Sequence, residues 1–405
     1  MDLQIAFVAT YPPRRCGIAT FTRDLARAVG GGRIVAIRDG SEPDIAPVEV
    51  VRQVSRDDPA DYRRAAREIN RSDVEVVSLQ HEYGIFGGED GADVLDLVES
   101  LEVPIAATLH TVLRRPSRSQ RSVIAALGDR VDKIVVMSRR AAELLDDVYD
   151  VDPDKVRVIR HGVPDLPLVD PNEAKPELGL AGREVILSFG LLGPGKGYEQ
   201  VIEAMARVRA VRPGALFVIL GSTHPDLVRR EGEAYRDRLR EQVDNLDLAD
   251  HVRFEDRYLT SAELGHWLLA ADIFVTPYPG LEQIVSGTLS YALGAGKAIV
   301  STPYAYATEL LADGRGMLVP PASPNALADA FVELLERPQL RTSMAERAYA
   351  YGRRMIWRRV GESYRDLFQE MGQETGVASA AGRVTSSPER ATSRAGEPAV
   401  VLARG

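Results

Sequence analysis

The sequence predicts an α/β protein in which two doubly wound parallel-sheet domains follow one another along the chain. Short apolar and β-branched runs alternate with stretches of helical periodicity, which is typical of parallel sheets covered by helices on both faces. A polar, proline-rich stretch at 161–184 interrupts this alternation, which then restarts. The chain has 405 residues, of which 45% are hydrophobic, and this is enough for two cores of ordinary size.

The first half is expected to alternate strands and helices without a break. The strands are short apolar runs, at 5–9, 34–37, 74–79, 105–109 and 133–137. The helices carry apolar residues at helical spacing, at 20–29, 61–70, 91–101 and 119–127.

The second half repeats the pattern after the polar interruption. Strands are expected at 185–189, 215–220, 252–254, 273–276 and 298–301. Helices are expected at 198–209, 226–245, 261–270, 288–293 and 325–335, followed by a basic helical stretch at 339–368. Residues 376–405 are rich in Ala, Ser, Gly and Arg without a sustained period, which indicates a flexible tail.

Composition excludes several classes of protein. The net charge of −9 argues against general attraction to nucleic acid or to an anionic membrane. Because Cys16 is the sole cysteine, no intrachain disulfide or cysteine-based zinc site can form, which favours a reducing compartment. No apolar run reaches the length of a membrane span, and the first residues lack the basic segment of a signal peptide, so a cytoplasmic protein is expected.

The stretch "GLLGPGKGYEQVIEAM" at 190–205 predicts a strand end, a glycine-rich turn and a helix start. Unpaired backbone N–H groups and the positive end of the helix dipole meet at such a junction, and Lys196 adds a charge. The junction is therefore a candidate phosphate site, beginning at Gly190. A tight turn with an exposed lysine is the structural alternative, and the spacing matches neither a P-loop nor GxGxxG.

A second candidate anion site follows the strand at 273–276. Ser286, Gly287 and Thr288 open a helix there, with two hydroxyls and exposed N–H groups, and Glu282 precedes them. Two anion sites that face one another suit a diphosphate. Other polar residues at strand ends of this half are Gly221, Arg257 and Tyr258.

Strand ends of the first half also carry candidate ligand residues. Gly17 opens a helix close to Arg14 and Arg15, where the chain backbone can approach a ligand, although a simple loop would explain the same residues. His81, Glu82 and Tyr83 follow one strand, and His110 follows the next. A lone histidine is more often structural than catalytic, but two at neighbouring strand ends favour a polar active-site wall.

These motifs, in this order, resemble those of the family 4 retaining glycosyltransferases of the GT-B fold, over residues 1 to about 370. The matching positions are Gly17, His110, Ser138, the segment 160–165, Gly190 with Lys196, Glu309 and Trp357. The resemblance implies two Rossmann-like domains facing a cleft, with an acceptor domain at 1–168 and a donor domain at 175–355. It also implies a helix at 356–372 that crosses back to the first domain, before the tail at 376–405.

The sequence departs from the family pattern at two places. Leu191 stands where the family has the diphosphate arginine, so this charge must come from elsewhere, with Arg257 or the Ser286 loop as candidates. The family's pair of glutamates is also incomplete, because counting from Glu282 makes the partner Ser290, while aligning on Gly296 makes the pair Gln283 and Tyr291. Glu282 takes the role of the first glutamate, and ribose recognition stays unassigned.

The resemblance implies transfer of a hexose from a nucleotide diphosphate sugar, of the GDP-mannose or UDP-glucose type, to a sugar or small-molecule hydroxyl with retention of configuration. His110, Lys196 and Glu282 are expected to be catalytic. The donor is expected to contact Gly17, Gly190, Gly221, Arg257, Tyr258, Ser286, Gly287, Thr288 and Glu309. The acceptor is expected to contact His81, Glu82 and Tyr83. No metal and no other cofactor is expected, because no Asp-x-Asp motif follows a strand.

Two alternatives stay open. A related nucleotide-sugar epimerase or hydrolase would keep the fold and dispense with the acceptor. A non-catalytic nucleotide-sugar-binding subunit would explain the missing arginine and glutamate. Turnover separates them, because only a transferase needs an acceptor and a binding subunit releases no nucleotide.

Overall fold

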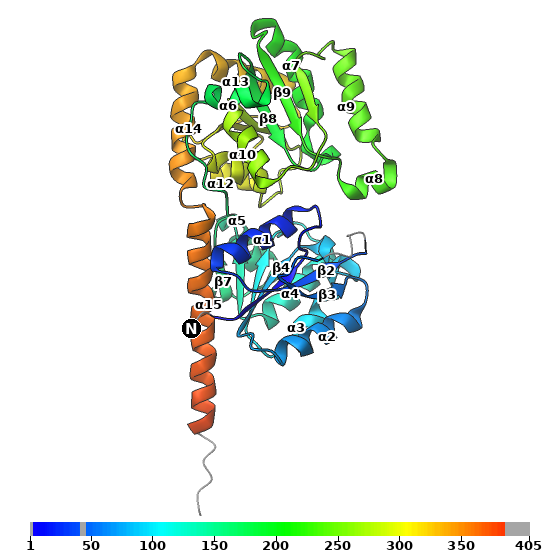
Figure 1. Cartoon of the computed structure of the whole chain (residues 1–405), viewed down its shortest axis with the longest axis vertical. Coiled ribbons are helices and arrows are strands. Elements are labelled where there is room, and N and C mark those ends of the chain that lie inside the picture. Colours follow the sequence, from blue (N-terminus) through cyan, green and yellow to red (C-terminus); the bar gives the residue numbers. More distant parts are fainter. Residues whose placement is uncertain (1–2, 41–45, 385–405) are drawn as a thin grey trace, which may run out of the picture.

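The computed structural model of the chain describes residues 3–40 and 46–384. Two domains lie one above the other in Figure 1, and each consists of a parallel sheet with helices on both faces. The predicted fold class, two doubly wound α/β domains in series, is confirmed.

The sheet of the first domain has the order β3-β2-β1-β4-β5-β6-β7, and all its pairings are parallel. Its strands are β1 (Ile5–Ala9), β2 (Arg33–Arg38), β3 (Val50–Ser55), β4 (Val76–His81), β5 (Ile105–Leu109), β6 (Lys133–Val136) and β7 (Val156–Val158). The order reverses between β1 and β4, which is the switch point of this sheet, where ligands of doubly wound folds bind.

Three features of this sheet differ from the prediction, and one of them is the short strand β7, which was not predicted. The strand expected at 74–79 is β4 (Val76–His81), so His81 is the last residue of a buried strand and does not lie in the following loop. The edge strand β3 was not predicted, because Arg52 and Gln53 interrupt its apolar run. An edge strand has an exposed side and does not need the continuous apolar run of a central parallel strand.

Helices cover both faces of this sheet. They are α1 (Gly17–Val29), α2 (Pro59–Asn70), α3 (Val94–Ser100), α4 (Arg118–Arg130) and α5 (Arg139–Tyr149). Helix α5 was not predicted, and Ser138 caps it by accepting a hydrogen bond from the Ala141 N–H at 3.2 Å. The Sγ atom of Cys16 caps α1 in the same way, by accepting a hydrogen bond from the Ala19 N–H. The sole cysteine therefore stabilises the start of this helix.

The sheet of the second domain has the order β10-β9-β8-β11-β12-β13 and is also fully parallel. Its strands are β8 (Glu184–Phe189), β9 (Ala215–Leu220), β10 (Val252–Glu255), β11 (Ile273–Thr276), β12 (Ala298–Ser301) and β13 (Met317–Leu318). The order reverses between β8 and β11, which places the two predicted anion sites at the switch point of this sheet.

The helices around the second sheet follow most of the predicted positions, but those at 171–174 and 305–310 were not predicted, and the helical stretch expected at 339–368 is interrupted at 353–356. They are α6 (Pro171–Ala174), α7 (Tyr198–Val211), α8 (Pro225–Glu231), α9 (Ala234–Asn245), α10 (Ser261–Ala270), α11 (Gly287–Gly294), α12 (Ala305–Leu310), α13 (Pro324–Glu336) and α14 (Pro338–Gly352). The single helix expected at 226–245 is two helices, because Gly232 adopts a left-handed conformation with φ 62° and ends α8.

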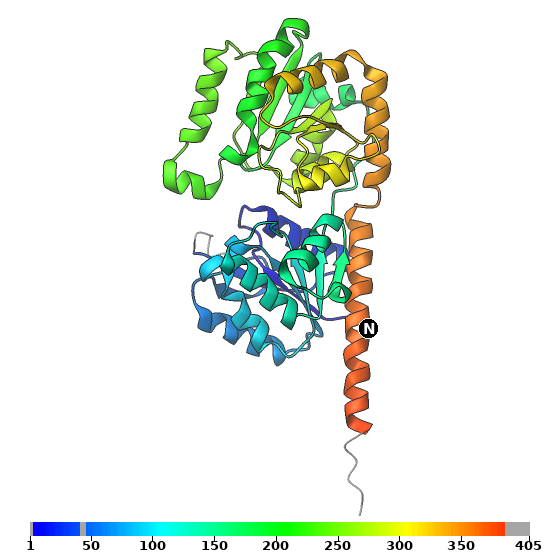
Figure 2. The same ribbon diagram turned by 180° about the vertical axis from the view of Figure 1, so that it is seen from behind.

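The last helix, α15 (Trp357–Val384), returns to the first domain and runs along its side in Figures 1 and 2. Its buried residues join the apolar cluster beneath α1, and they are Val360, Tyr364, Leu367, Phe368 and Met371. Gly361 allows a close approach, since a Cβ atom there would lie 2.4 Å from the Ala28 carbonyl oxygen. Residues 376–384 of the predicted tail are helical, and 385–405 lie outside the described residues.

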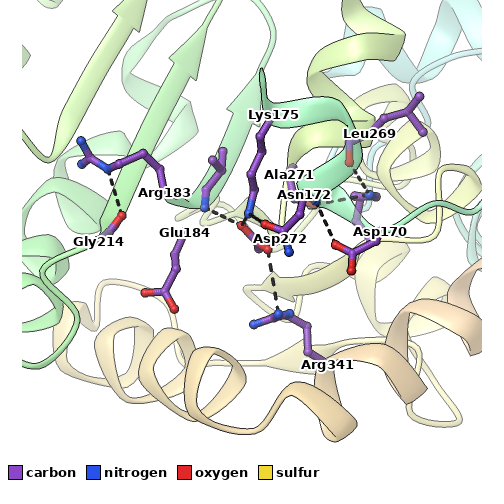
Figure 3. Close-up of polar contacts among 12 residues, drawn as sticks. Asp170, Asn172, Lys175, Arg183, Glu184, Gly214, Leu269, Ala271, Asp272 and Arg341 are labelled. Carbon is purple, nitrogen blue, oxygen red and sulfur yellow. Dashed lines mark hydrogen bonds and ion pairs between the residues drawn. The ribbon is translucent and has the colours of Figure 1, made fainter. Parts of the chain in front are cut away.

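A buried ion pair fixes the segment between the domains to the second domain. Lys175 Nζ lies 2.8 Å from Asp272 Oδ2, and both side chains are almost fully buried. The same carboxylate oxygen accepts a hydrogen bond from the Val185 N–H at 2.7 Å, while Arg341 approaches the other oxygen to 3.9 Å (Figure 3). The pair therefore joins the linker to the first residues of β8 and β11.

Lys297 lies close to this ion pair. Its Nζ donates hydrogen bonds to the carbonyls of Leu269 and Ala271 at the end of α10, at 3.2 and 3.3 Å. Burial lowers the pKa of Lys297 to about 8, against the opposing effect of Asp272. Lys297 is therefore a structural cap on a helix C-terminus and lies away from the strand ends that carry the candidate site.

Candidate active site

The carboxyl ends of the two sheets face each other, and direct contacts cross between the domains. Thr20 Oγ1 and Tyr258 OH are 3.2 Å apart, which joins α1 to the loop after β10. Ser138 Oγ donates a hydrogen bond to the Ile284 carbonyl at 3.1 Å. The loop 281–286 therefore contacts the first domain directly, and its Ile284 belongs to the core cluster of that domain.

The loop that carries Lys196 packs tightly on the loop after β11. Gly197 has φ 70°, and a Cβ atom there would lie 2.1 Å from the Pro277 carbonyl oxygen. Only glycine fits both requirements. This approach places Lys196 Nζ 4.6 Å from the centre of the Tyr278 ring.

The second predicted anion site lies beside the first. Ser286 caps α11, and its hydroxyl lies 3.1 Å from Thr288 Oγ1, which is 3.0 Å from Tyr278 OH. A Cβ atom on Gly190 would lie 3.4 Å from Thr288 Cγ2. Lys196, Gly190 and the start of α11 are thus brought together around Tyr278.

Three other glycines predicted to approach a donor differ in their surroundings. Gly221 has φ 135°, and a Cβ atom there would lie 2.2 Å from the Gly190 carbonyl oxygen, so it is required for the two loops to pack. A Cβ atom on Gly287 would lie 3.1 Å from His161 Nε2. Gly17 is the first residue of α1, and nothing described lies within 4 Å of a Cβ built there.

Three further polar residues predicted for the site, which are Glu282, Arg257 and Tyr258, have different surroundings. Glu282 is exposed on the loop between the domains. Arg257 Nη1 donates to Glu263 Oε1 at 2.5 Å, and Tyr258 is partly exposed beside Arg15. Arg257 is therefore paired with a carboxylate in this structure, and its role in place of the arginine that is missing at position 191 stays a prediction.

Glu309 contacts the first domain. Its carboxylate accepts hydrogen bonds from the Arg139 N–H at 3.0 and 3.2 Å and from the Arg140 N–H at 3.4 Å, at the start of α5. A carboxylate at a helix N-terminus satisfies unpaired N–H groups and interacts favourably with the helix dipole. In this structure Glu309 therefore joins α12 to α5 across the domain junction.

The residues predicted for the acceptor side lie at the end of β4 but differ in their exposure. Glu82 accepts hydrogen bonds from the Tyr83 N–H at 3.0 Å and from Thr111 Oγ1 at 2.6 Å, and burial raises its pKa. His81 is fully buried and stacks on Phe86, with ring centroids 5.9 Å apart. Because the His81 side chain has no exposed surface, it cannot contact an acceptor directly in this structure.

His110 has a different environment from His81. Its Nε2 lies 3.1 Å from Gln80 Oε1, and its ring meets the edge of Phe21 at 4.8 Å between centroids. Burial, with smaller effects of His161 and His81, lowers the pKa of His110 to about 3. The ring is therefore neutral at physiological pH, and donation from Nε2 to Gln80 leaves Nδ1 as an acceptor.

Tyr278 and His161 were not among the predicted site residues. His161 lies 5.2 Å from Phe21 and 6.0 Å from Tyr291 between ring centroids, so it joins rings of both domains. His161 lies in the segment 160–165, which is one of the segments that match the family pattern. This match could have indicated that His161 lies at the site. Tyr278 carried no signal of its own, because a tyrosine after a strand between two prolines is typical of any loop.

The described part of the chain, 3–40 and 46–384, contains no group of three or more His, Cys, Asp or Glu side chains placed to hold a metal ion. No helix within the same ranges is long and apolar enough to cross a membrane.

Comparison with known protein families covers both domains. Residues 17–165 match the family described as Glycosyltransferase Family 4, and residues 170–351 match the family described as Glycosyl transferases group 1. The two matches meet at the linker between the domains. Together they extend over all the elements that carry the candidate site.

Two relatives match most of the chain. A D-inositol 3-phosphate glycosyltransferase of Corynebacterium glutamicum is 24% identical over 369 residues, covering 86% of this chain and 84% of that protein. A phosphatidyl-myo-inositol mannosyltransferase of Mycolicibacterium smegmatis is 26% identical over 346 residues, covering 82% of this chain and 81% of that protein.

Solved structures share the fold. The Anabaena protein HepE, solved in complex with UDP, superposes with a TM-score of 0.75 at 16% identity, covering 91% of this chain and 100% of that one. Sucrose-phosphate synthase from Thermosynechococcus elongatus gives a TM-score of 0.74 at 18% identity, covering 91% of this chain and 99% of that one. At these identities the likeness establishes the arrangement of the two domains.

Proposed function

Because the chain belongs to the glycosyltransferases of family 4 and group 1, we propose that it transfers a hexose from a nucleotide diphosphate sugar to an acceptor hydroxyl, with retention of anomeric configuration. One observation supports the part of this proposal that concerns binding of the nucleotide-sugar donor. The loop of Lys196 and the start of α11 meet around Tyr278, at the switch point of the second sheet.

The diphosphate would bind where these two loops meet. Lys196 supplies a positive charge, Ser286 and Thr288 supply hydroxyls, and the first N–H groups of α11 supply donors and the positive helix end. Negative charge develops on the diphosphate as the sugar leaves, so donors already held in place stabilise the transition state. The absence of an arginine at Leu191 makes the site more dependent on Lys196.

The sugar would extend from the diphosphate toward the first domain. The bond between the anomeric carbon and the phosphate oxygen breaks, and a bond to the acceptor oxygen forms on the same face of the sugar. The acceptor proton passes to the departing phosphate oxygen, so no protein nucleophile is required. The neutral ring of His110 can accept a sugar hydroxyl at Nδ1, and Glu282 would contact the sugar from the loop between the domains.

The acceptor would bind against the first domain, near Glu82 and Tyr83. The proteins named among the relatives act, by their names, on D-inositol 3-phosphate and on phosphatidyl-myo-inositol. A phosphorylated cyclic polyol is therefore the first acceptor class to screen, next to simple sugars. We propose that the reaction needs no metal ion, because Lys196 and the N-terminus of α11 would carry the diphosphate charge.

The first test is a thermal-shift screen of UDP, GDP, dTDP and ADP and their common sugar conjugates. A ligand at one hundred times its dissociation constant adds about 2.7 kcal/mol to the free energy of unfolding. Transfer from the stabilising donor is then measured with and without EDTA, and the anomer of the product is read by NMR. Inversion of the anomer would contradict retention, and loss of activity in EDTA would contradict metal independence.

Lys196→Ala tests the donor site itself. We expect a loss of at least one hundredfold in kcat/KM, about 2.7 kcal/mol, because removing one donor to developing charge costs about this much in other enzymes. Activity within a few-fold of the wild type would refute the assigned role. Release of nucleotide without an acceptor would favour a hydrolase, and absence of any nucleotide shift would favour a different ligand class.

A further inference from the structure

Tyr278 lies at the contact between the two loops of the proposed diphosphate site. One face of its ring carries the Lys196 ammonium, 4.6 Å from the ring centre. A lysine above an aromatic face is held by attraction between its charge and the ring's electron density. The close packing of Gly197 on Pro277 fixes the distance between the two loops.

The hydroxyl of Tyr278 connects to the second loop. It lies 3.0 Å from Thr288 Oγ1, and Thr288 Oγ1 lies 3.1 Å from Ser286 Oγ. Although burial by itself raises the pKa of Tyr278, the Lys196 ammonium and these hydroxyls hold that pKa below its usual range. Ring and hydroxyl therefore contact the two anion-binding elements separately.

The surroundings of Tyr278 leave its ring little freedom. The side chain is almost fully buried, and it stacks on Tyr304 with ring centroids 5.1 Å apart and planes 24° from parallel. Thr302 Oγ1 donates a hydrogen bond of 2.6 Å to the Tyr278 carbonyl. A ring held at this many points can position the two groups that it contacts.

We propose that Tyr278 is a positioning residue that sets the Lys196 ammonium and the Thr288 hydroxyl in place for the two phosphates of the donor. The inference rests on the proposed function, because it assumes that a nucleoside diphosphate binds between these loops. It assigns to this chain a residue that couples the two parts of the site. Leu191 leaves the site without the arginine of the family pattern, so the charge of Lys196 matters more. Contact with the Tyr278 ring keeps the Lys196 ammonium from turning away into solvent.

Two substitutions separate the ring from the hydroxyl. Tyr278→Phe keeps the aromatic face and removes the contact to Thr288, and we expect the dissociation constant of a nucleoside diphosphate to rise about threefold. Tyr278→Leu removes both contacts, and we expect a rise of about tenfold or more. Tyr306→Phe is the matched control, because Tyr306 is a buried tyrosine of the same domain whose hydroxyl contacts Ser290 at 2.8 Å.

The ligands are UDP, GDP, uridine, guanosine and inorganic pyrophosphate, titrated by calorimetry against the full-length protein. A positioning role predicts weaker binding of the diphosphates and pyrophosphate with unchanged binding of the nucleosides. A general loss of structure would weaken all of them. Circular dichroism checks that each variant is folded, and Tyr278→Phe keeps the test decisive if Tyr278→Leu does not fold.

A double-mutant cycle completes the test. If Tyr278 acts through Lys196, combining Tyr278→Leu with Lys196→Met costs less than the sum of the two single changes. Additive effects, or diphosphate affinities equal to those of Tyr306→Phe, would overturn the inference and leave the proposed function intact. If the wild-type chain binds no diphosphate at all, both the proposed function and the inference are wrong.

Discussion

Gly197 shows how a single residue determines the shape of the candidate site. Its φ of 70° and the 2.1 Å distance between a Cβ there and the Pro277 carbonyl both exclude a side chain. We expect Gly197→Ala to destabilise the protein by about 1–3 kcal/mol and to weaken nucleotide binding, because the Lys196 loop must move. Gly195→Ala is the control, since nothing lies within 4 Å of a Cβ there.

Thermal denaturation and nucleotide titration measure both effects. Equal behaviour of the Gly197 and Gly195 variants would contradict the close contact. The sequence indicated a glycine-rich turn here, but not which glycine was indispensable. The distinction depends on the backbone of residue 277, which is eighty positions away along the chain.

His81 makes a prediction about pH. Burial lowers its pKa to about 3, and neither ring nitrogen has a hydrogen-bond partner among the described residues. The unfolded chain takes up a proton below about pH 6.5, while the folded chain does not until about pH 3, so stability falls as pH falls through this window. His81 should account for about 2 kcal/mol of the stability lost between pH 7 and pH 5.

His81→Phe removes the titrating group and keeps a ring on Phe86. We expect denaturant unfolding to show a smaller loss of stability between pH 7 and pH 5 than in the wild type, with little change at pH 7. His266→Gln is the control, because His266 is largely exposed. An unchanged pH dependence in His81→Phe would mean that the pKa of His81 does not differ between the folded and the unfolded chain.

At the scale of elements, the junction between α12 and α5 depends on one carboxylate. Glu309 accepts hydrogen bonds from the first N–H groups of α5, and Ser138 accepts a further one. We expect Glu309→Ala to cost about 1 kcal/mol and to allow the two domains to separate further. Glu143→Ala, an exposed position on α5 paired with Arg140, should do neither.

Calorimetric unfolding gives the stability of the two variants, and small-angle scattering gives the separation of the domains. A radius of gyration that does not change in Glu309→Ala would show that the other interdomain contacts are sufficient. The family resemblance pointed to Glu309 as a donor residue, and its donor role stays a prediction. Its contact with α5 could not be foreseen, because it depends on packing between segments that lie 170 positions apart in the chain.

At the scale of the whole molecule, α15 joins the second domain to the first. Gly361 allows the helix to lie against α1, since a Cβ there would be 2.4 Å from the Ala28 carbonyl oxygen. We expect Gly361→Ala to lower stability by about 1–3 kcal/mol, although alanine is the better helix former. Gly372→Ala is the control in the same helix, where the nearest atom is the flexible tip of Leu3 at 3.2 Å.

Thermal unfolding should therefore show a lower melting temperature for Gly361→Ala. The melting temperature of Gly372→Ala should rise slightly, because alanine is the better helix former. A loss at Gly372 as large as that at Gly361 would point to a general effect on the helix. In the wild type, the return of α15 buries apolar residues of both α1 and α15 in one cluster. The chain thus passes between the two domains twice, once through the linker near Lys175 and once through α15, and side-chain contacts such as that of Glu309 with α5 add to these connections.

The sequence by itself determined the fold class and the glycine-rich turns at the strand ends. These follow from local properties, because strand runs, helical periodicity and glycine-rich turns are readable in short windows. Only the tertiary structure decided which side chains meet. Tyr278 contacts Lys196, Glu309 contacts α5, and His81 is withdrawn into the core, because each outcome depends on packing between segments that are distant in the chain.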